Sequence, residues 1–211
     1  SKAHAMYVHA YGDEHPLNST ASLQIAQNLL APGYYEDAVA CEALAMKLRQ
    51  RTFESSCPAT ADCLLMRAMI LRDIRDYEES RKLFEQTLQI YLTAYGEGSS
   101  HYADTLMEYG ECLRQMGLFK DAEDALVRAV VYLKECYRAV TADNEWGGNN
   151  GPVIANYRIV KAMRTYALLQ LDTNRVRDAM EKLENEVYPA LVQLLGKKHP
   201  EAELTKGLIA V

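Results

Sequence analysis

Arg75-Asp76-Tyr77-Glu78-Glu79-Ser80 is the stretch that decides the fold. It combines a tight turn with an aromatic residue, acidic residues and a small residue. The same combination occurs in three other places, at 34–38, at 118–122 and, more loosely, at 175–179. The aromatic residues of the first three stretches, Tyr35, Tyr77 and Phe119, are evenly spaced (77 − 35 = 42 and 119 − 77 = 42). A fixed period of this size indicates a repeat array.

A second set of markers repeats with the same period. It consists of the aromatic residues Tyr11, Phe53, Tyr95 and Tyr137, accompanied by Pro16, Pro58 and Ser100. Proline suits the first turn of a helix, because its missing N–H would be unpaired there in any case. Each unit is therefore expected to run from an aromatic residue through a short junction, a first helix (helix A) and a tight turn to a second helix (helix B).

These markers divide the chain into units. Helices A are predicted over about 19–31, 59–74, 102–116 and 152–171, and helices B over about 35–53, 77–95, 119–140 and 176–195. We predict one repeat domain, 1–211, with units 17–58, 59–100, 101–152 and 153–196, and partial units at 1–16 and 197–211. A loop insertion of Gly and Asn residues is predicted at 141–152. Partial units at both ends indicate a piece of a longer chain.

The turn from helix A to helix B repeats its chemistry. Gly33, Gly117 and Asn174 occupy equivalent positions, and these residue types tolerate the left-handed conformation at a helix C-terminus. Arg75 departs from the pattern. The second turn is therefore either built differently or slightly strained.

Small residues mark where the two helices of a unit meet. They lie in helix A at Ala26, Ala68, Gly110 and Ala167, and at a constant offset in helix B (38 − 26 = 12, and likewise for the others) at Ala38, Ser80, Ala122 and Ala179. Small side chains there allow two antiparallel helices to approach closely. The period alone also admits HEAT or armadillo repeats, whereas the helical periodicity argues against propeller blades.

This small-residue pattern, with leucine neighbours and the aromatic-acidic-alanine turn, resembles the tetratricopeptide repeat (TPR). The length of the unit and the junctions Tyr11–Pro16, Tyr95-Gly96 and Leu195–Pro200 resemble the kinesin light chain and nephrocystin-type subclass. The resemblance covers nearly the whole chain. It implies an all-α fold, a right-handed α-solenoid of antiparallel helix pairs, and a role as a cytoplasmic protein-interaction module.

Composition and charge argue against several classes of function. The net charge of −6 and the pI of about 5.4 argue against nucleic acid as the main partner, because phosphate binding needs a basic face. No apolar run approaches the ~20 residues that span a bilayer. The five cysteines form no C-x-x-C, which suits a reducing cytosol. No catalytic or metal-binding constellation occurs, so we expect neither an enzyme nor a cofactor.

In the family, helix A lines a concave groove. The resemblance carries this peptide-binding role to Leu65, Met66, Met69, Arg72, Asp104, Met107, Glu108, Glu111, Arg114, Arg164 and Leu168. Two pairs, Leu65-Met66 and Met107-Glu108, stand where kinesin light chains carry asparagines. The methionines are expected either to form an adaptable apolar strip in the groove or to pack in the core. A partner peptide or helix with apolar anchors is expected rather than a purely acidic one.

Trp146 is the only tryptophan and lies in the predicted insertion, where it either anchors a partner or packs back on its own helices. The function implied by the resemblance is an interaction scaffold or adaptor, for motor cargo or ciliary assembly. The alternative is a regulatory or sensor repeat domain of a multidomain signalling protein, linked to an ATPase.

Overall fold

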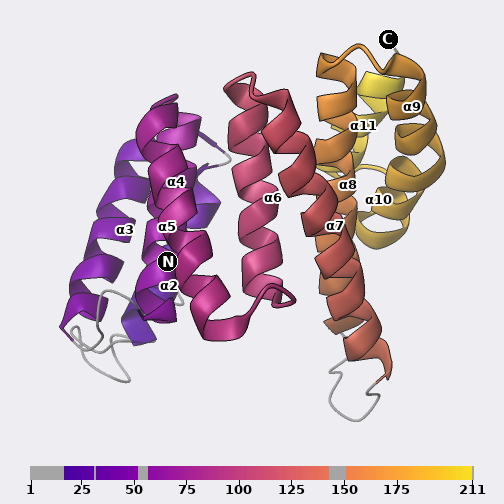
Figure 1. Cartoon of the computed structure of the whole chain (residues 1–211). Coiled ribbons are helices and arrows are strands. Elements are labelled where there is room, and N and C mark those ends of the chain that lie inside the picture. The colour runs from indigo at the N-terminus through magenta and orange to yellow at the C-terminus, as the bar shows by residue number, and fades with distance from the viewer. Residues whose placement is uncertain (1–16, 31, 52–56, 143–150, 211) are drawn as a thin grey trace. The chain divides into compact units, whose positions relative to one another are not determined.

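The computed structural model describes residues 17–30, 32–51, 57–142 and 151–210, and their regular structure is helical (Figure 1). The chain divides into two compact units, 1–96 and 97–211, each of which is described by itself. Within each unit, consecutive helices pack as antiparallel pairs of helix A and helix B. The predicted all-α fold of paired helices is confirmed.

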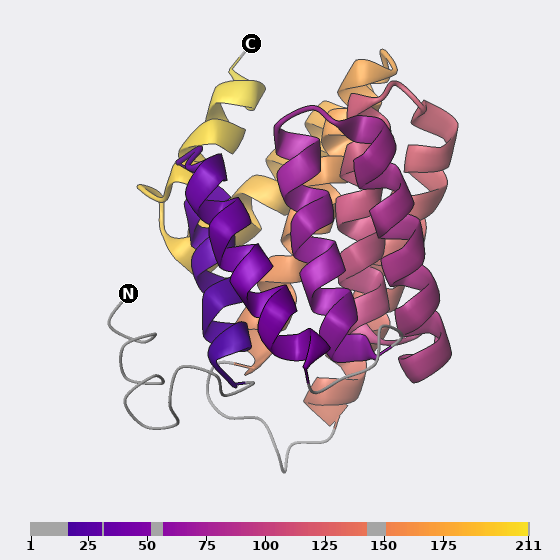
Figure 2. The same cartoon turned by 90° about the vertical axis from the view of Figure 1, so that its left-hand side faces the viewer.

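The first unit contains two pairs. Helices α2 (Leu17–Leu30) and α3 (Tyr35–Gln50) form one, and α4 (Pro58–Asp73) and α5 (Tyr77–Tyr95) form the other. In Figure 2 these helices face the viewer and run alongside one another. The observed bounds differ from the predicted ones by only a few residues, because Pro and Gly mark most of the junctions.

The second unit contains α6 (Ser100–Gln115), α7 (Phe119–Ala142), α8 (Gly151–Asp172) and α11 (Pro200–Ile209). The fourth helix B, predicted over 176–195, is present as α9 (Val176–Lys182), a π-helical turn (Leu183–Val187) and α10 (Tyr188–Leu195) without a break. The N–H of Tyr188 bonds to the carbonyl of Leu183, five residues back. Pro189 follows directly; it has no N–H to donate and crowds the carbonyl four residues before it, which favours this wider turn.

All four turns from helix A to helix B share one backbone geometry. Gly33, Arg75, Gly117 and Asn174 have φ of 82°, 68°, 77° and 61°. In each turn, the N–H of this residue bonds to the carbonyl three residues back, and the next N–H bonds to the carbonyl five residues back. This is the Schellman motif that satisfies carbonyls at a helix C-terminus. Arg75 is therefore built like the others and is the strained member, because an arginine lacks the freedom of glycine at positive φ.

The small residues of the helix pairs are buried, as predicted. Ala68, Ser80 and Ala122 are completely buried, as are Ala26, Ala38, Ala167 and Ala179. A Cβ added to Gly110 would lie 2.6 Å from Cγ of Leu126 and 3.4 Å from the carbonyl oxygen of Ala122. The helix pairs can therefore pack this closely only with small side chains at these positions. We refer to these contacts as the small-residue crossings.

Two junctions show how a helix A begins. The Ser99 hydroxyl accepts a hydrogen bond from the N–H of Tyr102 at 3.3 Å and caps α6. His199 caps α11, with Nδ1 accepting from the N–H of Glu201 at 3.3 Å. The junction histidine thus has a structural capping role. Each junction also contains a glycine at positive φ, Gly96 or Gly196.

The predicted insertion needs a correction. Helix α7 continues to Ala142 and α8 begins at Gly151, so residues 141–142 and 151–152 are helical and were wrongly assigned to the loop. Trp146 and the partial unit at 1–16 lie outside the described residues. The remaining part of the predicted insertion, 143–150, is also outside them.

Candidate functional site

The candidate site is the set of helix A residues to which the resemblance assigns a groove. Four of them, on α4, belong to the first unit and seven, on α6 and α8, to the second. Each set is described within its own unit.

In the first unit, most of these side chains are buried. Met66 and Met69 of α4 expose only 6% and 8% of their surface, and Arg72 exposes 8%. The Nε of Arg72 donates to the carboxylate of Asp73 at 3.0 Å. Only Leu65 is half-buried. Of the two alternatives for the methionines, burial favours packing in the core.

A buried polar network holds the four helices of the first unit in register. Arg49 of α3 donates to the hydroxyl of Ser19 on α2 at 2.8 Å and pairs with Asp62 of α4 at 2.9 Å. The other carboxylate oxygen of Asp62 accepts from the hydroxyl of Tyr91 on α5. Arg49 also donates to the carbonyl of Ala59. Charged groups that are buried need such partners, because an unpaired one would be costly.

A second buried acid in this unit is less completely satisfied. Glu42 of α3 is almost fully buried, and its Oε2 accepts two bonds from Arg67 of α4, at 2.9 and 3.1 Å. Its Oε1 has no hydrogen-bond partner in the part of the chain that is described. Burial raises the pKa of Glu42, while Arg67 opposes the rise. This pair joins the first repeat to the second.

In the second unit, the predicted residues form a ladder of ion pairs between α6 and α8. Asp104 pairs with Arg158 at 3.0 Å and Glu108 with Lys161 at 2.7 Å. We refer to these pairs, together with the arginine that follows, as the charge ladder. Acidic residues three and four apart on α6 face cations three apart on α8, so the rungs follow the helical repeat.

Arg114 completes the charge ladder at its far end. It holds Glu111 with two bonds of 2.8 Å, through Nε and Nη2. Its Nη1 donates to the carboxylate of Asp172, the last residue of α8. The two acids thus share one guanidinium. Met107, which lies between the acids of α6, exposes only 5% and belongs to the core.

The carboxyl of Asp104 has a pKa above its usual range. Burial raises its pKa to about 6, and Glu108 adds to the rise, while Arg158, Lys161 and His101 oppose it. Desolvation is the largest cause, since a carboxylate loses hydration that one partly exposed arginine replaces incompletely. This carboxyl therefore changes its charge near pH 6.

Arg164 and Leu168 are the predicted residues of α8 that the charge ladder does not use. The Nε of Arg164 is buried and has no hydrogen-bond partner among the described residues. Leu168 lies one turn further along α8 and is half-buried. On α8, the unsatisfied Nε of Arg164 thus lies one turn from the partly exposed side chain of Leu168.

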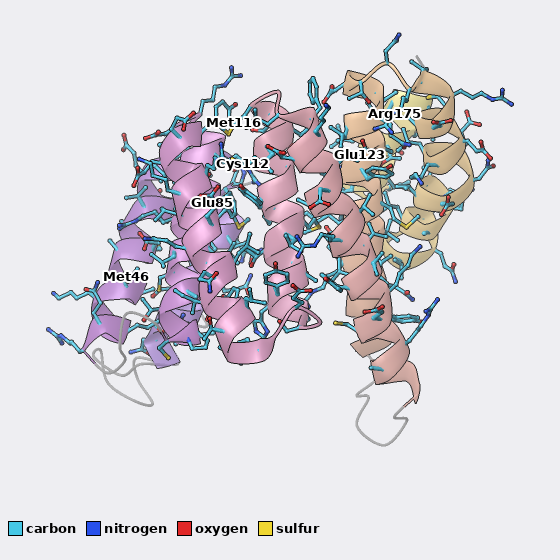
Figure 3. All side chains as sticks on the ribbon, viewed as in Figure 1. Met46, Glu85, Cys112, Met116, Glu123 and Arg175 are labelled. Carbon is cyan, nitrogen blue, oxygen red and sulfur yellow. The ribbon has the colours of Figure 1, made fainter. Side chains whose placement is uncertain are left out.

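A third link of the second unit joins α7 to α8 and to the turn before α9. Glu123 of α7 accepts from Arg175 at 2.7 Å and from the hydroxyl of Tyr166 at 3.0 Å; Glu123 and Arg175 are labelled in Figure 3. Hydrogen bonding to Arg175 holds the pKa of Glu123 below its usual range. One acid of α7 thus holds an arginine in the turn before α9 and a tyrosine of α8.

Sequence reasoning brought together the acids of the ladder and Arg114, but it missed Arg158, the partner of Asp104, and Asp172, a partner of Arg114. The signal that could have found Arg158 is the pairing of acids at 104, 108 and 111 with cations at 158 and 161 on the next helix A. Within the described residues, no cluster of three or more His, Cys, Asp or Glu could hold a metal ion. Nor does any described helix have the length and apolar character needed to cross a membrane.

Comparison with known proteins identifies the repeat. Residues 59–130 match the model of the tetratricopeptide repeat. Nothing among curated proteins matches the chain. Two solved structures are similar to this chain, and at these identities they show the fold alone.

The first comes from Podosopora anserina and consists of nearly identical TPR-like repeats assigned to a kinesin light chain. It is 17% identical with a TM-score of 0.55, and the match covers 93% of this chain and 85% of that one. The second is BtubC (BKLC) from P. vanneervenii, at 13% identity and a TM-score of 0.63, covering 99% of this chain and 76% of that one. Residues 59–130 are therefore tetratricopeptide repeat sequence, and the fold of the chain has distant structural similarity to kinesin light chain-like repeats.

Proposed function

We propose that this chain is an interaction scaffold that holds a peptide or helix of a protein partner along its helix A face. Tetratricopeptide repeats are generally protein–protein interaction modules. The observation that carries the finer proposal is the buried, unsatisfied Nε of Arg164 beside the half-buried Leu168. An adaptor role in motor-cargo or ciliary assembly is the form of this function that the family resemblance supports.

The state of the charge ladder supports this choice of residues. Asp104, Glu108 and Glu111 are each paired with a cation of their own chain, so a partner would have to break an existing pair to use them. The Nε of Arg164 has no hydrogen bond within the described residues that a partner would have to break. A buried donor without a partner costs about 1–3 kcal/mol. A shift of the Arg164 side chain toward a partner carboxylate would give this donor an acceptor and remove that cost.

The burial of Met66, Met69 and Met107 changes the expected partner. The three methionines are buried and do not form the expected apolar strip. The predicted apolar residues that stay partly exposed are Leu65 in the first unit and Leu168 in the second. A partner segment should therefore present a carboxylate to Arg164 and an apolar side chain to Leu168. This combination is typical of an amphipathic helix or a mixed extended peptide, and a purely acidic segment would leave the leucine unused.

The test is affinity capture with the full-length protein, followed by mass spectrometry. Wild type is compared with the double variant Arg164→Ala/Leu168→Ala. The matched control is Val176→Ala/Arg177→Ala, which removes the same two kinds of side chain from exposed positions on α9. A true partner is captured by wild type and by the control and is lost from the double variant.

Binding is then measured by titration with the partner so identified. The double variant should bind at least tenfold more weakly, which corresponds to about 1.4 kcal/mol. Equal affinity of wild type and the double variant would remove Arg164 and Leu168 from the binding face. The alternative of an ATPase-linked sensor domain remains a prediction, and a nucleotide-binding sequence next to these repeats in the full protein would favour it.

A further inference from the structure

The first unit contains an open cleft of about 480 Å³ between α3, α4 and α5. Its apolar lining consists of Met46 (labelled in Figure 3), Leu64 and Ile90, one residue from each helix. The polar lining is neutral, with Thr60 and three glutamines, Gln50, Gln86 and Gln89. The volume falls in the range of small-ligand sites in proteins. The cleft lies among helix B residues and the start of α4, so it is separate from the residues used in the proposed function.

The repeat itself shows what this space can accommodate. In the register of the repeat, Thr60 corresponds to Tyr102, Gln86 to Arg128 and Ile90 to Tyr132. Tyr102 occupies the third position of α6, as Thr60 does in α4. Arg128 and Tyr132 occupy the same positions of α7 that Gln86 and Ile90 occupy in α5. Three smaller residues of the first unit thus stand where the second unit has three larger ones.

In the second unit these three larger side chains contact one another. The rings of Tyr102 and Tyr132 lie 6.2 Å apart and are tilted by 55°. Arg128 donates to the hydroxyl of Tyr102 at 3.1 Å, and its guanidinium carbon lies 6.0 Å from the centre of that ring. Tyr102 is buried by this arrangement. Among the described residues, the second unit therefore fills this position of the repeat with its own aromatic side chains, whereas the first unit has a cleft there.

We propose that the cleft of the first unit binds a tyrosine or phenylalanine side chain presented by a partner polypeptide. The ring would contact Met46, Leu64 and Ile90, in the manner of Tyr102 and Tyr132 in the next repeat. Thioether and aliphatic groups form favourable contacts with aromatic rings. The glutamine amides supply both donors and acceptors for the phenol hydroxyl and for the peptide groups on either side of the ring.

The neutral lining argues against a charged ligand. None of the seven lining residues carries a charge, so an ion entering the cleft would lose hydration without gaining a partner of opposite sign. The glutamines argue for a polypeptide rather than a free phenol. A free phenol offers one hydroxyl, whereas a peptide offers several backbone groups for the amides to bind.

The test uses the intact chain with methyl-labelled Met, Leu and Ile, observed by NMR. The probes are p-cresol, which has the side chain of tyrosine; 4-methylcyclohexanol, its saturated analogue; p-toluate, its charged analogue; and the blocked peptide N-acetyl-Gly-Tyr-Gly-amide. We expect p-cresol to shift the methyl resonances of Met46, Leu64 and Ile90. The peptide should bind more tightly than p-cresol, and the other two probes at least tenfold more weakly.

Two variants locate the binding. Ile90→Tyr introduces the tyrosine that the second unit has at this position, and it should weaken p-cresol binding at least tenfold. Ile90→Ala removes apolar contact without adding bulk, and should weaken it about threefold. Val39→Tyr is the matched control, because it adds the same side chain at an exposed position of α3 outside the cleft, and it should bind p-cresol like wild type.

Four outcomes would overturn the proposal. They are the absence of methyl shifts with p-cresol, binding that persists in a folded Ile90→Tyr variant, equal affinity for p-cresol and 4-methylcyclohexanol, and a peptide that binds no more tightly than p-cresol. The third would reduce the cleft to a general apolar surface, and the fourth would assign it to a free phenol. None of them bears on Arg164 or Leu168, so this proposal can fail while the proposed function stands.

Discussion

The hydroxyl of Ser80 donates a hydrogen bond of 2.7 Å to the backbone carbonyl of Ala68, and this bond joins α5 to α4 at a small-residue crossing. The equivalent residues of the other three pairs are alanines, Ala38, Ala122 and Ala179. The bond is thus an addition to the crossing and not a requirement of it. What all four crossings require is a side chain small enough to be buried between two helices.

We expect Ser80→Ala to change the free energy of unfolding by less than about 1 kcal/mol. One hydrogen bond contributes about 1 kcal/mol, and alanine recovers part of it through its higher helix propensity. Ser80→Leu should cost about 1–3 kcal/mol by overpacking the crossing. Urea unfolding of both variants measures the difference, and equal costs for the two would mean that the hydroxyl, not the size, matters at this position.

Arg75→Gly should stabilise the chain by up to about 1 kcal/mol. Arg75 has φ of 68° in the turn before α5, and a left-handed residue with a Cβ costs about 1–2 kcal/mol, of which the greater freedom of glycine in the unfolded chain removes a part. The reverse change, Gly117→Arg at φ of 77°, should destabilise by a similar amount. Thermal unfolding of the two variants should shift the melting temperature in opposite directions; shifts of the same sign would contradict the strain at Arg75.

Gly110→Ala should destabilise the second unit by about 1–3 kcal/mol, because its new Cβ would lie 2.6 Å from the side chain of the buried Leu126. Gly207→Ala is the matched control. Gly207 is also in a helix, α11, but a Cβ there meets nothing within 4 Å, so alanine should stabilise by up to about 1 kcal/mol. Denaturant titration gives both values. A stabilising Gly110→Ala would show that Leu126 moves aside without cost.

Much of the fold could be predicted from the sequence because its signals are local and repeated. The constant period located the helix pairs, and Gly33, Gly117 and Asn174 marked three of the turns. Arg75 could not be assigned from its residue type, since only the equivalence of the four turns shows that it also adopts positive φ. The pairing of helices can therefore be predicted from the sequence pattern. The strain at Arg75 is visible only in the backbone dihedral angle.

The candidate site could be predicted only in part. A position on helix A says which way a side chain points but not how closely the neighbouring helix approaches, so the burial of Met66 and Met107 required coordinates. Arg158 was missed because its partner, Asp104, lies on another helix, more than a full repeat earlier in the sequence. The cleft was missed for a different reason. The smaller residue Thr60 at the position of Tyr102 indicates a cleft only once the packing around both residues is known.

Met66→Ala and Met107→Ala should each cost about 2–4 kcal/mol of unfolding free energy, as for truncation of a buried methionine. Met116→Ala is the control, because Met116 follows the end of α6 and is only half-buried, so its truncation should cost less than about 1 kcal/mol. Chemical unfolding measures all three. If Met66→Ala and Met107→Ala are as mild as the control, these methionines belong to an exposed groove after all.

The charge ladder should give the second unit a defined dependence on pH. Burial raises the pKa of Asp104 to about 6, above the value of 3.8 for an unperturbed aspartate. A carboxyl whose pKa is higher in the folded state contributes stability that is fully present below the unfolded pKa and is lost as the pH rises through the folded value. The loss for Asp104 therefore falls between about pH 4 and pH 6.

Asp104→Asn removes this titration while keeping a side chain of similar size. Between pH 4 and pH 7 the variant should gain about 1–2 kcal/mol relative to wild type; a shift of roughly two units sets an upper limit of about 3 kcal/mol, which solvent screening reduces. The measurement is urea unfolding at several pH values for wild type, Asp104→Asn and the control Asp124→Asn, whose carboxylate is 72% exposed. The control should stay parallel to wild type across the range. If Asp104→Asn also stays parallel, the carboxyl of Asp104 titrates at an ordinary pKa and Arg158 offsets its burial completely.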